Sequence, residues 1–220
     1  MPDKAGQYDE RMISKFGEYY FKTIKRIVEL AQPKSTDTVL DIGTGTGAVS
    51  FAIAPRVKKV VAIDIDQGML EEAKRKAESA NIENVEFRPG SFLKPNIDEK
   101  VDVIVSNIAL HHLTDEDKAK AIKKMAELLN ENGKILLADV MIFSETAQKE
   151  IDDVLDAIRE YFGRKKSKAI KELRVVFKKK YPAKYEDLER MFKEAGLEIV
   201  KVEKMFSIFG IISARKASAQ

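Results

Sequence analysis

The chain has no cysteine, no tryptophan and only two histidines. Without cysteine, the sequence excludes disulfides, a thiolate nucleophile and a Cys-ligated zinc site. No apolar run approaches the roughly 20 residues that a membrane-spanning helix needs. The N-terminus, residues 1–4, opens no apolar segment of the kind that begins a secretory signal. These absences predict a cytoplasmic protein without a membrane span.

Charge is abundant but nearly balanced, with 39 Lys and Arg against 36 Asp and Glu and a formal net charge of +3. So small an excess does not by itself indicate nucleic-acid binding. Hydrophobic residues make up 44% of the 220 positions. A chain of this length buries about 70% of its unfolded surface. We therefore expect one large domain spanning residues 1–220.

A glycine-rich stretch follows the first predicted strand. The apolar run 38–42 predicts a buried strand, and Gly43, Gly45 and Gly47 come directly after it. A helical pattern then starts at Ala48. Strand, glycine turn and helix form the arrangement that brings backbone N–H groups and a helix N-terminus close to a ligand.

Two acids accompany this turn. Asp41 stands at the end of the first strand, where a carboxylate can face a cationic ligand group. A second apolar run, 59–64, ends in Asp64, about 20 residues beyond the first glycine. At that spacing an acid reaches the hydroxyl pair of a ribose.

These residues resemble motif I and the following acidic position of the class I S-adenosylmethionine-dependent methyltransferases. The resemblance implies S-adenosyl-L-methionine as the cofactor. It places Asp41 near the methionine moiety and Asp64 at the ribose hydroxyls. It also implies that backbone passes close to the cofactor at Gly43, Thr44, Gly45 and Gly47.

The same resemblance assigns further contacts. Ile65 and Met69 would line the adenine side, and Tyr8 would cover the cofactor from the N-terminal segment. Many relatives carry an Asp at or near Ser91 that binds the adenine amino group, and here that acid is missing. The resemblance leaves Ser91 as an acceptor of a weaker hydrogen bond from that amino group, and Phe92 either contacts the adenine ring or packs in the core.

The fourth predicted strand, 101–107, ends in Asn107-Ile-Ala-Leu-His-His-Leu113. This signature is similar to that of small-molecule methyltransferases of the quinone-biosynthesis type, and it implies that Asn107 and Ile108 lie by the methionine end. On extended backbone, His111 and His112 would point apart, which makes them a poor metal pair. They either support the loop or supply a general base.

The periodicity of the remaining chain predicts alternating strands and helices. We expect an α/β fold, a doubly wound Rossmann-like sheet of seven mostly parallel strands. The resemblance implies that its last strand runs antiparallel between the fifth and the sixth. Asn132-Gly133 would stop the helix before the fifth strand. The expected strands are 38–42, 59–64, 84–88, 101–107, 134–140, 197–203 and 206–214, and the expected helices are 12–31, 46–55, 66–80, 114–131 and 185–195.

Four parts make up the predicted domain: an N-terminal helical segment 1–35, a cofactor-binding core 36–140, a helical lid 141–184, and a C-terminal helix and strand pair 185–216. Within the lid, residues 164–184 hold ten Lys and Arg and one acid, Glu172. That excess fits a solvated helical face, or a site for an anionic substrate, RNA or an acidic membrane surface.

The sequence therefore favours a methyltransferase that moves a methyl group to a small-molecule acceptor, an isoprenoid quinone precursor for example, by direct in-line transfer. A nicotinamide-dependent oxidoreductase is the alternative, because Gly43, Gly45 and Ala48 also fit a dinucleotide-binding turn. Tyr161 and Lys165 fit the Tyr-x-x-x-Lys pair of short-chain dehydrogenases. Methylation of RNA through residues 164–184 and a non-catalytic cofactor-binding partner are further alternatives. The oligomeric state cannot be read from the sequence.

Overall fold

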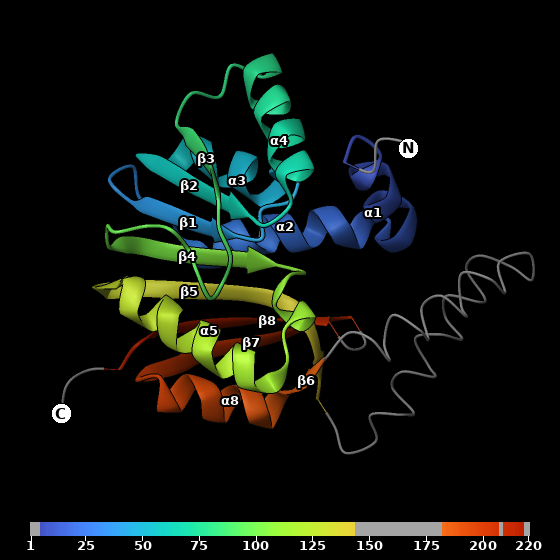
Figure 1. Ribbon diagram of the computed structural model, residues 1–220. Helices are drawn as coiled ribbons and strands as arrows, with labels where there is room; N and C mark the ends of the chain where they lie inside the picture. Colours follow the sequence, from blue (N-terminus) through green and yellow to red (C-terminus); the bar gives the residue numbers. More distant parts are fainter. Residues whose placement is uncertain (1–4, 144–181, 207–208, 218–220) are drawn as a thin grey trace, which may run out of the picture.

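The computed structural model describes residues 5–143, 182–206 and 209–217. Figure 1 shows a central twisted sheet with helices on both faces. Seven strands follow one another in the order β3-β2-β1-β4-β5-β8-β7, and a short strand, β6, pairs with the end of β5. The strands are β1 (Thr38–Ile42), β2 (Lys59–Asp64), β3 (Val85–Pro89), β4 (Val101–Asn107), β5 (Leu129–Ile142), β6 (Ala183–Lys184), β7 (Leu197–Phe206) and β8 (Phe209–Lys216).

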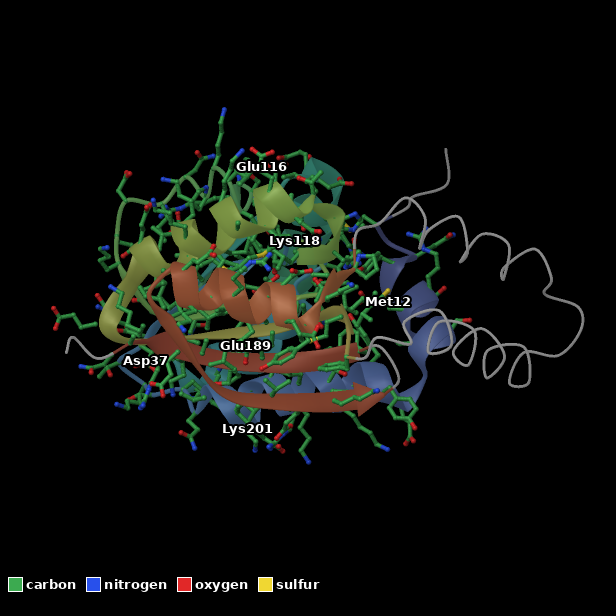
Figure 2. The ribbon with its side chains drawn as sticks, turned by 90° about the horizontal axis from the view of Figure 1, so that it is seen from below. Met12, Asp37, Glu116, Lys118, Glu189 and Lys201 are labelled. Carbon is green, nitrogen blue, oxygen red and sulfur yellow. The ribbon has the colours of Figure 1, made fainter. Side chains whose placement is uncertain are left out.

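Apolar residues on each face of the sheet bury themselves against a separate set of helices. One core cluster joins α2 and α3 to the sheet, and the other joins α5 and α8 to it. Figure 2 labels Lys118 on α5 and Glu189 on α8, which lie side by side on one face. The helices are α1 (Tyr8–Phe16), α2 (Glu18–Ala31), α3 (Ala48–Ile53), α4 (Gln67–Ser79), α5 (Asp115–Leu128) and α8 (Tyr185–Glu194), with 3-10 turns at Ala54–Arg56 and Leu110–His112.

The predicted doubly wound sheet is confirmed, including its antiparallel last strand. Strands β1 to β5 pair in parallel, and β8 lies antiparallel between β5 and β7. The chain builds outward from β1 to β3 and then crosses to β4 on the other side of β1. The carboxyl ends of β1 and β4 therefore meet at a topological switch point, where sheets of this kind bind ligands.

The N-terminal helix differs from its prediction. Residues 12–31 were expected as one helix, but α1 begins at Tyr8 and a break at Gly17 separates it from α2. Gly17 has φ 54° and ψ −133°, a region that is open almost only to glycine. The break turns α1 away from α2, so the first helix projects separately (Figure 1).

The end of α5 was also predicted wrongly. The helix ends at Leu128, and β5 starts at Leu129 instead of at 134. Gly133 does not cap the helix but lies inside the strand. A Cβ there would come within 2.8 Å of Leu129 Cδ2 and 3.2 Å of the Asp102 carbonyl oxygen. Glycine thus permits a close backbone approach at this position.

Most of the predicted lid, residues 144–181, lies outside the described residues, as do Tyr161, Lys165 and the basic positions before 182. On the described residues either side of this gap, β6 pairs in parallel with the end of β5. Among the helices that the structure describes, none has the length and apolar character needed to cross a bilayer.

Candidate functional site

The glycine turn after β1 forms the floor of the candidate site. Its three glycines all have positive φ, at 75°, 56° and 89°. A Cβ on Gly43 would come within 2.5 Å of Ala109 Cβ, so the turn must lack a side chain there to pack against the loop after β4. The N–H groups of Gly43 and Thr44 donate to the Ile63 carbonyl at 2.8 and 3.0 Å. These two hydrogen bonds therefore fix the turn against the end of β2.

A narrow cavity of about 20 Å³ lies over this turn, and it holds about one water molecule. Its walls come from the turn, from the carboxyl ends of β1 and β4, and from α1, α2 and α3. Seven of the predicted site residues line it: Tyr8, Asp41, Gly43, Thr44, Gly45, Asn107 and Ile108. The sequence interpretation missed the other lining residues: Met12, Tyr20, Thr46, Ala48 and Val49.

Asp41 is 1% exposed and accepts two hydroxyl hydrogen bonds on its Oδ2. Thr44 Oγ1 lies 2.9 Å away and Ser50 Oγ lies 2.6 Å away. Burial raises the pKa of Asp41 to about 6, the charge of Asp64 adds to the rise, and the hydroxyl hydrogen bonds oppose it. Among the described residues, no Lys, Arg or His forms an ion pair with Asp41. A buried carboxylate without such a partner gains most from a ligand that brings positive charge.

Asn107, at the carboxyl end of β4, faces the same cavity. Its Oδ1 is the one buried side-chain polar atom without a hydrogen-bond partner in the part of the chain that the structure describes. Leaving such an acceptor unpaired costs about 1–3 kcal/mol. An orphaned acceptor and a buried carboxylate on one cavity together fit a ligand that donates hydrogen bonds, such as an ammonium group.

Ile108 follows with a φ of 57°, which is rare for a β-branched residue. Such strain costs about 1–3 kcal/mol and persists only where surrounding contacts hold it. The Ile108 N–H donates to the Ala138 carbonyl at 2.8 Å. This strained residue is one of those that line the cavity.

Asp64 closes the outer edge of the turn. Its Oδ2 accepts from the Gly45 N–H at 2.8 Å, and its Oδ1 accepts from the Asp66 N–H at 2.9 Å. The carboxylate is half-buried and keeps lone pairs for further donors. Its position beside the turn matches the predicted spacing from the glycines.

The predicted adenine contacts do not reach the cavity as the structure stands. Ile65 is 82% exposed, and Met69 is half-buried on α4. Ser91 accepts from the Lys94 N–H at 3.1 Å within its own turn. Phe92 is 7% exposed and packs in the core beneath α5. Gly47 does not line the cavity either, and a Cβ there would come within 2.5 Å of the Phe51 ring.

The two histidines lie on a 3-10 turn, not on the extended backbone that was predicted. Their rings are 4.4 Å apart between centroids and inclined by 31°. His111 is buried and lies 2.6 Å from Asp139 Oδ1 through its Nδ1, whereas His112 is exposed. The sequence pattern did not single out Asp139, which lies inside the predicted strand 134–140 and is followed by further apolar residues.

Helix α1 covers the cavity. Tyr8 and Met12 contribute to its wall, and Figure 2 shows Met12 on this helix. Asp9 accepts from Thr46 Oγ1 at 2.5 Å and pairs with Lys76 on α4. One carboxylate thus connects α1 to both the glycine turn and α4.

Comparison with known proteins gives one consistent result. A family model described as "Methyltransferase domain" matches residues 33–196. An uncharacterized methyltransferase of Oceanobacillus iheyensis is 31% identical over 185 residues, covering 80% of this chain and 84% of the relative. One of Bacillus pumilus is 30% identical over 217 residues, covering 96% and 93%.

A solved structure of magnesium protoporphyrin IX methyltransferase from Synechocystis PCC 6803, with bound SAH, has the same fold. It superposes with a TM-score of 0.68 at 19% identity, covering 93% of this chain and 86% of that one. At this identity the likeness concerns the fold alone.

Proposed function

Because the chain belongs to the methyltransferase-domain family and uses S-adenosylmethionine, we propose that it methylates a small-molecule acceptor by direct in-line transfer. The observation that carries the cofactor part of this proposal is that buried Asp41 and the Asn107 Oδ1, which lacks a hydrogen-bond partner, line the same cavity. Both groups accept hydrogen bonds from an ammonium group, and the amino-acid end of the cofactor has one.

Each wall of the cavity has a proposed role. Asp41 and Asn107 bind the amino-acid end, and the strained backbone of Ile108 fixes the direction of the Asn107 side chain. Asp64 binds the ribose hydroxyls from the edge of the turn. Tyr8 and Met12 on α1 cover the cofactor and exclude water. The glycine turn lets the backbone approach without side-chain clashes.

The cofactor supplies a methyl group that its sulfonium has already made electrophilic. The remaining task of this chain is mainly positioning, because well-oriented reactants avoid much of the entropy loss of a bimolecular step. Where the acceptor must lose a proton, His112 is the proposed general base. It is exposed, and its ring lies against the buried ring of His111.

Two observations support a small-molecule acceptor. The loop after β4 has the Asn-Ile-Ala-Leu-His-His-Leu signature of the small-molecule branch. The Synechocystis neighbour of the same fold is a magnesium protoporphyrin IX methyltransferase, named for a small molecule.

Thermal unfolding with S-adenosylhomocysteine, beside NADH and NADPH as controls, tests the cofactor part of the proposal. Ligand at about 100 times its Kd adds about 2.7 kcal/mol to the free energy of unfolding. For a chain of this size that raises the midpoint by about 5–10 °C. A rise with a nicotinamide alone would contradict the proposal. With binding established, turnover measured over a panel of small molecules and over RNA identifies the acceptor class.

A further inference from the structure

A buried pair of side chains lies beneath the loop that carries Asn107 and Ile108. His111 Nδ1 and Asp139 Oδ1 are 2.6 Å apart, and both side chains are 3% exposed. The His111 backbone N–H also donates to Asp139 Oδ2 at 3.0 Å. Asp139 therefore holds His111 through its ring and through its backbone.

The ionisation of Asp139 fixes the direction of the ring hydrogen bond. Burial acts to raise the pKa of Asp139, but the charge of His111 and the hydrogen bonds from His111 and Val140 outweigh it and lower the pKa. An ionised carboxylate only accepts, so Nδ1 of His111 carries the hydrogen. The bond sets both the tautomer and the orientation of the ring.

This pair stands next to the strained part of the loop. Ile108 holds its positive φ while its N–H bonds to Ala138, the residue before Asp139. Between Ile108 and His111, Ala109 packs so closely on the turn that a Cβ on Gly43 would lie 2.5 Å from Ala109 Cβ. The Ala109 carbonyl in turn accepts from the His112 N–H at 3.2 Å. Contacts thus run without interruption from Asp139 to the cavity wall.

We propose that Asp139 and His111 form a clamp that holds the loop after β4 in the strained shape needed to present Asn107 and Ile108 to the amino-acid end of the cofactor. Strain in a binding site persists only where neighbouring contacts fix it. In this assignment both are positioning residues. The inference rests on the proposed function, which places the amino-acid end of the cofactor at Asp41 and Asn107.

The decisive variants are His111→Ala, which removes the ring donor, and His111→Asn, whose amide can donate to Asp139 from nearly the position of Nδ1. Asp139→Ala is a third variant that removes the other partner. For each we measure the Kd of S-adenosylhomocysteine by calorimetry, and the Kd of adenosine, which lacks the amino-acid end. We expect His111→Ala and Asp139→Ala to weaken S-adenosylhomocysteine binding by about tenfold or more. Adenosine binding should change by less than about twofold, and His111→Asn should stay within about threefold of the wild type.

Asp102→Asn is the matched control. Asp102 also joins two segments, accepting from the Thr38 N–H at 2.8 Å and from Asn130 Nδ2 at 2.7 Å. It lies at the amino end of β4, opposite the cavity. We expect this variant to lower the unfolding midpoint and to leave both Kd values unchanged.

Three results would overturn the clamp: unchanged S-adenosylhomocysteine binding in His111→Ala, an equal loss of adenosine binding, or a loss in His111→Asn as large as in His111→Ala. If Asp139→Ala fails to fold, the two His111 variants still decide. Wild-type protein that does not bind S-adenosylhomocysteine at all would instead count against the proposed function, so the two failures are distinguishable.

Discussion

Asp41 is a carboxyl group whose ionisation the protein places close to neutral pH. Burial raises its pKa to about 6 in the free protein. A cationic ligand needs the ionised form, so binding at pH 5 must first remove a proton from Asp41. The affinity of the site for an amino-acid ligand should therefore fall as the pH drops through 6.

We predict that the Kd of S-adenosylhomocysteine at pH 5 is about tenfold higher than at pH 7.5, since a pKa of about 6 leaves roughly a tenth of Asp41 ionised at pH 5. Calorimetric titrations across this range measure it. Adenosine serves as the control ligand, and its Kd should stay constant. A constant Kd for both ligands would mean that Asp41 does not bind the amino-acid end.

Single residues also show which parts of the candidate site could be predicted from the sequence. Asp41 and Asn107 lie at the carboxyl ends of predicted strands, and the structure brings them together on one cavity, as parallel strand ends require. Asp139 lies inside a predicted strand, 134–140, and its partner lies 28 residues earlier. The 3-10 turn that buries His111 has no periodic signal, so the pattern indicated neither the pairing nor the stacking of the two rings.

At the scale of elements, we expect α1 to move before the cofactor can enter. It closes a cavity of about 20 Å³, far below the several hundred cubic ångströms of a typical ligand pocket. Asp9 attaches α1 to Thr46 and Lys76. A charged hydrogen bond of this kind contributes about 1.5–3 kcal/mol, and the partly exposed ion pair adds less than about 1 kcal/mol.

We predict that Asp9→Ala raises the association rate of S-adenosylhomocysteine by about fivefold or more, because opening α1 then breaks fewer bonds. Stopped-flow tyrosine fluorescence suits the measurement, since the chain has six Tyr and no Trp and the cavity is lined by Tyr8 and Tyr20. Glu10→Ala, an exposed neighbour on the same helix, is the control. Equal rates in all three proteins would show that Asp9 does not limit entry.

The elements also show which sequence signals suffice. Strands β1, β2 and β4 were predicted because each apolar run is bounded by turn residues and followed by a helical pattern of period 3.6. The two-residue strand β6 was not predicted, since it lies within the expected helical lid 141–184. The break at Gly17 was missed because apolar residues continue at helical spacing across it. The early end of α5 was missed because Asn132-Gly133 looks like a helix stop. Glycine is needed at position 133 because a Cβ there would clash with Leu129 and with nearby backbone oxygens. Such a packing requirement cannot be predicted from sequence periodicity.

For the molecule as a whole, the raised pKa of Asp41 lowers the stability of the free protein at neutral pH. Its folded-state pKa of about 6 exceeds the ordinary 3.8, so the folded protein holds this proton more tightly than the unfolded chain does. Below pH 3.8 Asp41 is protonated in both the folded and the unfolded protein, and its ionisation does not change the free energy of unfolding. As the pH rises through 6 the folded protein loses about 3 kcal/mol relative to that limit.

We therefore predict that Asp41→Asn stabilises the free protein by about 1–3 kcal/mol at pH 7.5 and has little effect at pH 4. Urea unfolding at the two pH values measures the difference. The same variant should lose the thermal shift caused by S-adenosylhomocysteine. A variant that is less stable than the wild type at pH 7.5 would show that the carboxylate carries no such cost.

The place of β8 in the sheet has a consequence for how the protein is made. Residues 209–216 lie between β5 and β7, although they follow both along the chain. During synthesis this position stays empty until those residues have left the ribosome, and the edge of β5 remains open until then. That edge includes Asp139, which pairs with Gly210 in the finished sheet. A nascent chain therefore has an unpaired, aggregation-prone edge at β5 until residues 209–216 have emerged.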